Sequence, residues 1–83
     1  GWVDENTFYY TGQGQTGNMQ FVLGNKALLN HQAEGKELHL FKWIETGRYK
    51  YLGQFRYDSF LIMDGYDFQG QPRKIIRFTL KKN

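Results

Sequence analysis

From residue 37 onward the pattern of side chains repeats every two positions, which is the period of a β-strand. Both faces of residues 37–44 carry apolar side chains, so this segment is predicted to be a central strand. Thr46-Gly47 then predicts a turn into a half-buried strand over residues 49–58, which residues 60–63 continue or bend.

A final strand is predicted over residues 74–80, where Ile76, Phe78 and Leu80 alternate inward. Turn residues are expected to precede it, at Asp64-Gly65 and again at residues 69–72. Together with the two earlier segments, this strand predicts a three-stranded antiparallel meander.

The N-terminal part predicts a strand over residues 7–11, a glycine-rich loop over 12–18 and a helix over 26–34 capped by Gly24-Asn25. The fold class is therefore α+β and mostly β: a small curved sheet or barrel with one helix packed across it. A single strand before the helix leaves an open edge. We therefore expect either that residues 1–83, which form one domain, are the C-terminal part of a larger barrel, or that a partner covers the edge.

Several classes of function find no support in the sequence. The chain has no Cys and only two His residues, His31 and His39, so neither a disulfide framework nor a metal site is expected. Ser59 lacks the context of a nucleophile, and no cofactor is expected. Gly12, Gly14 and Gly17 spell a dinucleotide-binding pattern, but the preceding strand is aromatic and a meander follows, so we reject it. With no signal peptide and no apolar run long enough to span a bilayer, a cytoplasmic protein is predicted. No set of acid, base and nucleophile is found in the sequence, so the chain is not expected to be an enzyme.

The net charge is +3, and residues 71–83 contain five basic side chains and no acid. This distribution suits an anionic partner such as nucleic acid, although a solvated edge strand protected by lysine explains it equally well. Near the N-terminus, Trp2, Asp4 and Tyr10 precede the glycine loop, and two rings with a carboxylate suit a flat ligand such as a nucleobase. On this chemistry alone, the simpler explanation that Trp2 and Phe8 close the core is slightly favoured.

Four segments, in matching order and spacing, resemble the SRA domain (SET and RING associated, also called YDG). They are Phe8-Tyr9-Tyr10-Thr11-Gly12-Gln13-Gly14, Gly24-Asn25-Lys26-Ala27-Leu28, Tyr51-Leu52-Gly53-Gln54-Phe55-Arg56-Tyr57 and Ile76-Arg77-Phe78-Thr79-Leu80. The likeness is greatest to the compact bacterial type found in HNH-type, modification-dependent restriction endonucleases. It implies a PUA-like barrel that binds duplex DNA and flips a 5-methyl or 5-hydroxymethyl cytosine into an aromatic pocket. The catalytic domain of such a nuclease is expected outside this chain.

The resemblance also implies roles for individual residues. In the pocket, Tyr10 and Trp2 are expected to stack on the base, Thr11 and Gly12 to form its floor, and Asp4 to accept a hydrogen bond from the cytosine amine. Insertion into the gap left by the base is expected from a short loop, through Gln13, Gln15 or Met19. The candidate phosphate contacts are Arg48, Lys50, Arg56, Arg73, Lys74 and Arg77.

A second hypothesis is a module that binds RNA, single strands or a protein through an aromatic surface without flipping a base. Tyr49 or Tyr57 would then matter more than Asp4.

Overall fold

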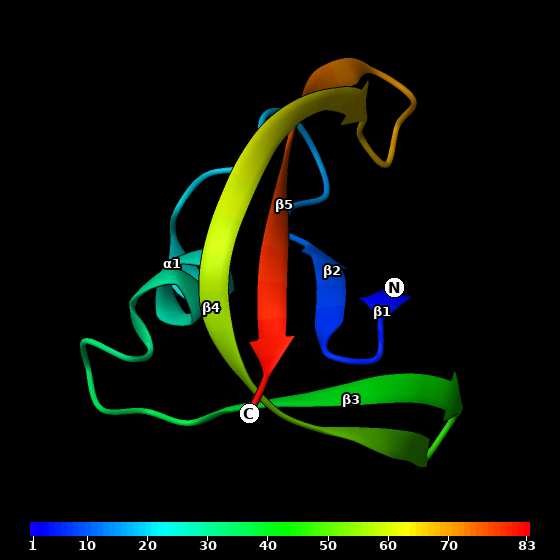
Figure 1. The fold of residues 1–83 in the computed structure, drawn as a ribbon. Coiled ribbons are helices and arrows are strands. Elements are labelled where there is room, and N and C mark those ends of the chain that lie inside the picture. Colours follow the sequence, from blue (N-terminus) through cyan, green and yellow to red (C-terminus); the bar gives the residue numbers. More distant parts are fainter.

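The computed structural model describes residues 1–83 as one curved antiparallel sheet with a helix against it (Figure 1). This confirms the predicted α+β, mostly β fold. The strands follow the order β1-β2-β5-β4-β3 across the sheet. The elements are β1 (Trp2–Asp4), β2 (Thr7–Thr11), α1 (Leu23–Asn30), β3 (Leu38–Glu45), β4 (Arg48–Tyr66) and β5 (Pro72–Lys82).

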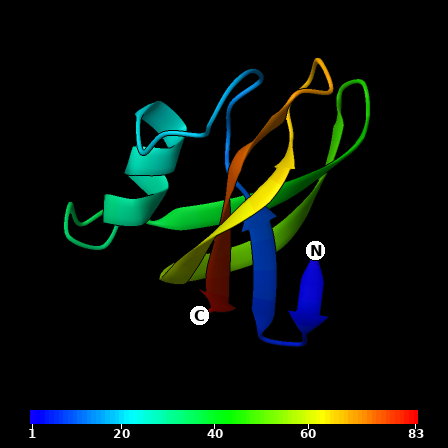
Figure 2. The same ribbon diagram turned by 90° about the horizontal axis from the view of Figure 1, so that it is seen from above.

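The curvature of the sheet comes from β4, which changes partner along its length. Its first part pairs with β3 and its second part with β5, and Phe55 pairs on both sides, with Leu38 and Lys82. Register shifts interrupt both ladders, and such bulges bend a strand. Beside one of them Gly53 adopts a φ of 124°, which side chains rarely tolerate. The β3–β4 hairpin therefore crosses the rest of the sheet (Figures 1 and 2).

The core lies on the concave face of this curved sheet. Ile76, Phe78 and Leu80 of β5 point into it and are fully buried, as their alternation predicts. Helix α1 adds Leu28, and Met19, which precedes the helix, is also buried in the core. The other core side chains are Leu40 and Phe55. Helix α1 is too short to cross a membrane.

Two predictions about the strands are wrong. First, β3 is an edge strand rather than a central one, and Phe41 and Trp43 are each 61% exposed. Second, Asp64-Gly65 does not form a turn, because both residues continue β4 and pair with Lys74 and Arg73 of β5. The sequence analysis also missed β1, which pairs with β2 and extends the sheet at the edge that was expected to be open.

The helix begins and ends earlier than predicted. Its N-cap is Val22, which makes no side-chain capping bond, and Asn25 lies inside the helix with its side chain buried. His31, which directly follows the helix, is also buried. Its Nε2 accepts a hydrogen bond from the backbone N–H of Tyr57 at 3.0 Å, so its Nδ1 carries the proton that is donated to the Lys36 carbonyl at 2.8 Å. This histidine joins α1 to β4.

Candidate functional site

A cavity of about 420 Å³ lies between the β1–β2 pair and the β3–β4 hairpin. Trp2 and Tyr10 both line it, and we call it the Trp2–Tyr10 cavity. The two rings share a face because Trp2 pairs with Phe8, and Phe8 and Tyr10 alternate along β2. The remaining lining residues are Gly1, Phe8, Leu40, Phe41, Lys42 and Leu52. The cavity is thus mostly apolar, with aromatic rings in its walls.

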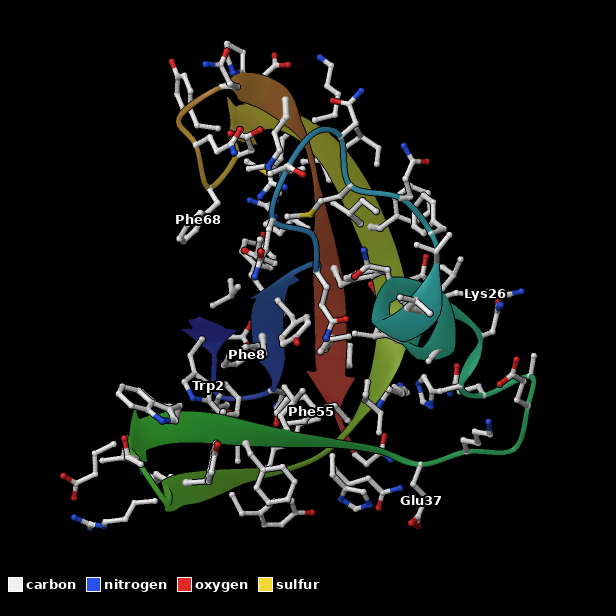
Figure 3. All side chains as sticks on the ribbon, turned by 180° about the vertical axis from the view of Figure 1, so that it is seen from behind. Trp2, Phe8, Lys26, Glu37, Phe55 and Phe68 are labelled. Atoms are coloured by element: carbon white, nitrogen blue, oxygen red, sulfur yellow. The ribbon has the colours of Figure 1, made fainter.

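Trp2 both closes the core and lines the cavity. Its ring packs edge-on against Phe8, with ring centroids 5.2 Å apart, and lies 5.6 Å from the ring of Phe55. Figure 3 shows these three residues gathered beside the hairpin. Trp2 is nevertheless 46% exposed, so part of its ring remains open to a ligand. The two explanations given above for Trp2 are therefore compatible.

Three other predicted pocket residues lie outside this cavity. Asp4 accepts a hydrogen bond from the backbone N–H of Asn6 at 2.8 Å, and this bond, followed by one from the Thr7 side chain, lowers the pKa of Asp4. Thr11 lies at the end of β2, and the N–H of Gly12 donates to the Ile76 carbonyl at 2.8 Å. The fold thus brings together Trp2 and Tyr10, but not Asp4, Thr11 and Gly12, around one hollow.

The glycine loop is fastened to helix α1 by Asn25. Its Oδ1 accepts from the N–H of Gln13 at 2.7 Å, and its Nδ2 donates to the carbonyls of Gln13 and Gln20, both at 2.9 Å. A Cβ on Gly12 would lie 3.0 Å from the same Oδ1, and a Cβ on Gly24 would collide with the Gln13 side chain. The sequence analysis missed this role, although Gly24-Asn25 is among the segments that carry the resemblance.

The three residues predicted to insert into DNA occupy different environments. Gln13 and Gln15 have exposed side chains on the glycine loop. Met19 lies in the core, where its sulfur accepts a hydrogen bond from the N–H of Ile76 at 3.3 Å. Met19 would have to leave the core to reach DNA, whereas the two glutamines would not.

The loop is also held by Asp67, which lies in the turn between β4 and β5. One carboxylate oxygen accepts from the N–H groups of Gln69 and Gln71, both at 2.9 Å, and the other accepts from Gly17 at 3.1 Å. The bond from Gln71 is the largest cause of a lowered pKa for Asp67, followed by the bond from Gly17. The ionised carboxylate is thus the form that ties the loop to the turn.

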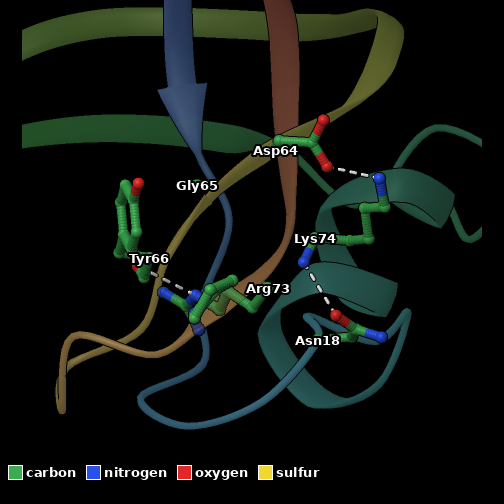
Figure 4. Close-up of a pocket in the computed structure, with 7 residues that line it drawn as sticks. Asn18, Asp64, Gly65, Tyr66, Arg73 and Lys74 are labelled. Atoms are coloured by element: carbon green, nitrogen blue, oxygen red, sulfur yellow. Dashed lines mark hydrogen bonds and ion pairs between the residues drawn. The ribbon is translucent and has the colours of Figure 1, made fainter.

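Two of the predicted phosphate contacts serve this same junction. The guanidinium of Arg73 donates to the carbonyl of Gly14 at 2.7 Å and to that of Tyr66 at 3.2 Å, and Lys74 forms an ion pair with Asp64. Both residues line a polar hollow of about 570 Å³ beside the loop (Figure 4). Arg73 still has its Nη2 donors and Lys74 has N–H donors beyond its one ion pair, so either could bind a phosphate while keeping these partners.

The other predicted phosphate contacts differ in whether their side chains already have a partner within the chain. Arg48 pairs with Glu45 at 2.6 Å, and Arg56 donates to the Lys82 carbonyl at 3.3 Å. The guanidinium of Arg77 lies 3.9 Å above the ring of Tyr9. Lys50 has no hydrogen bond or ion pair to any side chain, so it is the least committed of the six.

Comparison with models of known protein families shows which family the chain belongs to. Residues 1–82 match the family model described as the ScoMcrA-like SRA domain. The chain belongs to this SRA family. Searches of curated proteins and of solved structures found no match. The predicted resemblance is confirmed, and it identifies the chain as a DNA-binding module rather than a catalytic one. Membership of the SRA family indicates recognition of modified DNA.

In this SRA domain, Asn25→Ala should lower the free energy of unfolding by about 1–3 kcal/mol, because it leaves loop N–H and carbonyl groups without partners. Urea unfolding measures the change. Asn30→Ala is the matched control: it lies in the same helix without a side-chain hydrogen bond and should cost less than about 0.5 kcal/mol. Equal losses in the two variants would contradict the role given to Asn25.

Acid should release the glycine loop of the SRA domain. Because the pKa of Asp67 is lowered in the folded chain, its contribution is present at neutral pH and is lost as pH falls through a value below the ordinary 3.8. Backbone N–H resonances of Gly17 and Gln71 should therefore titrate with a midpoint below 3.8. Asp67→Asn should abolish this transition, and a midpoint at or above 3.8 in the wild-type chain would refute the assignment.

Proposed function

We propose that this SRA domain binds duplex DNA and takes a 5-modified cytosine, flipped out of the stack, into the Trp2–Tyr10 cavity. The observation that carries the proposal is that the two rings expected to stack on the base line the same hollow. The cavity is formed by aromatic and aliphatic side chains, which suit the face of a pyrimidine ring.

The energetics of this proposal rest chiefly on stacking. Flipping a base costs a few kcal/mol, and stacking on an aromatic side chain returns about 1–3 kcal/mol per base. Two rings therefore offset most of the cost. Burying one methyl group against apolar residues such as Leu40 and Leu52 adds about 0.8 kcal/mol, or about fourfold in affinity. A preference for 5-methylcytosine much greater than fourfold would need polar contacts as well.

Asp4, Thr11 and Gly12 are the proposed source of these polar contacts. The Asp4 carboxylate can accept from the cytosine amine while it keeps its bond from the backbone N–H of Asn6, but it lies outside the cavity, so the proposal gives it a smaller part than the two rings. Gln13 and Gln15 are proposed to occupy the gap left by the base, since their side chains are exposed. The proposal also assigns DNA cleavage to a nuclease domain attached outside this chain.

The test is fluorescence polarisation with matched duplexes that carry cytosine, 5-methylcytosine or 5-hydroxymethylcytosine at one position. The wild-type chain should prefer a modified duplex. Tyr10→Ala should bind that duplex about 5- to 150-fold more weakly, which corresponds to the stacking energy of one ring. Tyr66→Ala is the control, because this exposed ring lies at the far end of β4 and should leave binding unchanged. Equal binding of the wild-type chain to all three duplexes would refute the proposal.

One observation favours the second candidate, a module that does not flip bases. The β3–β4 hairpin carries large exposed rings in two cross-strand pairs, Phe41 with Tyr51 and Trp43 with Tyr49. If this face binds nucleic acid or protein directly, Tyr49→Ala should weaken binding and Tyr10→Ala should not. The same titrations therefore separate the two candidates.

A further inference from the structure

Two lysines lie directly opposite each other on the β3–β4 hairpin. Lys42 of β3 pairs with Lys50 of β4 in the ladder. Like charges at directly opposed positions destabilise a sheet, and neither lysine forms an ion pair. The one acidic residue of β3, Glu45, is held by Arg48 at the turn. The hairpin thus maintains a paired positive charge that nothing in the chain neutralises.

This lysine pair lies beside the Trp2–Tyr10 cavity. Lys42 is one of the residues that line it, together with Leu40 and Leu52 of the same hairpin. Directly paired residues of neighbouring strands project from the same face of a sheet, so Lys50 shares the face of Lys42. Trp43 and Tyr49 alternate with these positions and therefore project from the other face, whereas Phe41, next to Lys42 and beside a register shift, also contributes to the cavity lining. The lysine pair and the cavity accordingly lie on the same face of the hairpin.

We propose that Lys42 and Lys50 form a clamp for a phosphate of the nucleotide whose base enters the Trp2–Tyr10 cavity. The inference rests on the proposed function. A flipped base remains joined to its phosphates through a single sugar, so it brings an anion to the cavity mouth. That anion neutralises the opposed lysines and releases counterions from the DNA. Lys42, which is absent from the phosphate contacts predicted from sequence, becomes a binding residue through its place in the ladder.

The salt dependence of binding tests the clamp. For a duplex with one 5-methylcytosine, the plot of log K against log salt concentration should lose about one unit of slope in the Lys42→Gln/Lys50→Gln variant, since one phosphate contact is lost. Lys26→Gln removes an exposed lysine from helix α1 and should leave the slope unchanged. An unmodified duplex should show a smaller change in slope, because no flipped nucleotide reaches the clamp.

A neutral methylphosphonate in place of a phosphate next to the modified cytosine locates the contact. It should weaken binding of the wild-type chain and have much less effect on the double variant. A double variant with wild-type slope, or an equal methylphosphonate effect in both proteins, would overturn the clamp. If the wild-type chain prefers the modified duplex but the slope is unchanged, only the clamp fails. If the wild-type chain shows no preference, the proposed function fails and the clamp with it.

Discussion

The hydrogen bonds of the buried Asn25 side chain are the constraint on which the arrangement of the site depends. They hold the chain between β2 and helix α1 against the helix, at Gln13 in the glycine loop and at Gln20 after it. Tyr10 lies at the end of β2, just before this loop, and it also lines a second hollow of about 270 Å³ in which Asn25 takes part. An amide that satisfies three loop groups at once fixes the direction in which the chain leaves β2. Together with the ladder in which Tyr10 pairs with Phe78 of β5, this anchored loop sets the position of the Tyr10 ring and hence of one wall of the cavity.

The opposite wall depends on the change of partner along β4. Because Phe55 pairs with both β3 and β5, the hairpin turns away from the plane of the sheet and faces the β1–β2 pair. Contacts between Phe55, Phe8 and Trp2 then join the two parts of the fold. The Trp2 ring is half exposed because one side packs against Phe8 and Phe55 and the other side lines the cavity. Packing and recognition thus use the same aromatic side chains.

The sequence predicted local features better than the positions of strands in the sheet. The alternation of Ile76, Phe78 and Leu80 was sufficient to predict their burial, because β5 has neighbours on both sides. The same rule failed for β3, whose second apolar face remains exposed at the sheet edge. Local turn propensity at Asp64-Gly65 gave way to pairing with β5. The resemblance identified Trp2 and Tyr10, which share a cavity. The pairing of Lys42 with Lys50 depends on the register between two strands, so it cannot be recognised from the sequence alone.

The central claim is that a modified cytosine leaves the duplex and enters the Trp2–Tyr10 cavity. Imino-proton NMR of a short duplex with one 5-methylcytosine tests it most directly, because each guanine imino resonance reports one intact base pair. On addition of the chain, the resonance of the guanine opposite the modified cytosine should disappear while those of distant pairs persist. Tyr10→Ala should restore it. A resonance that remains in the saturated wild-type complex would show that the pair stays closed and would contradict the account.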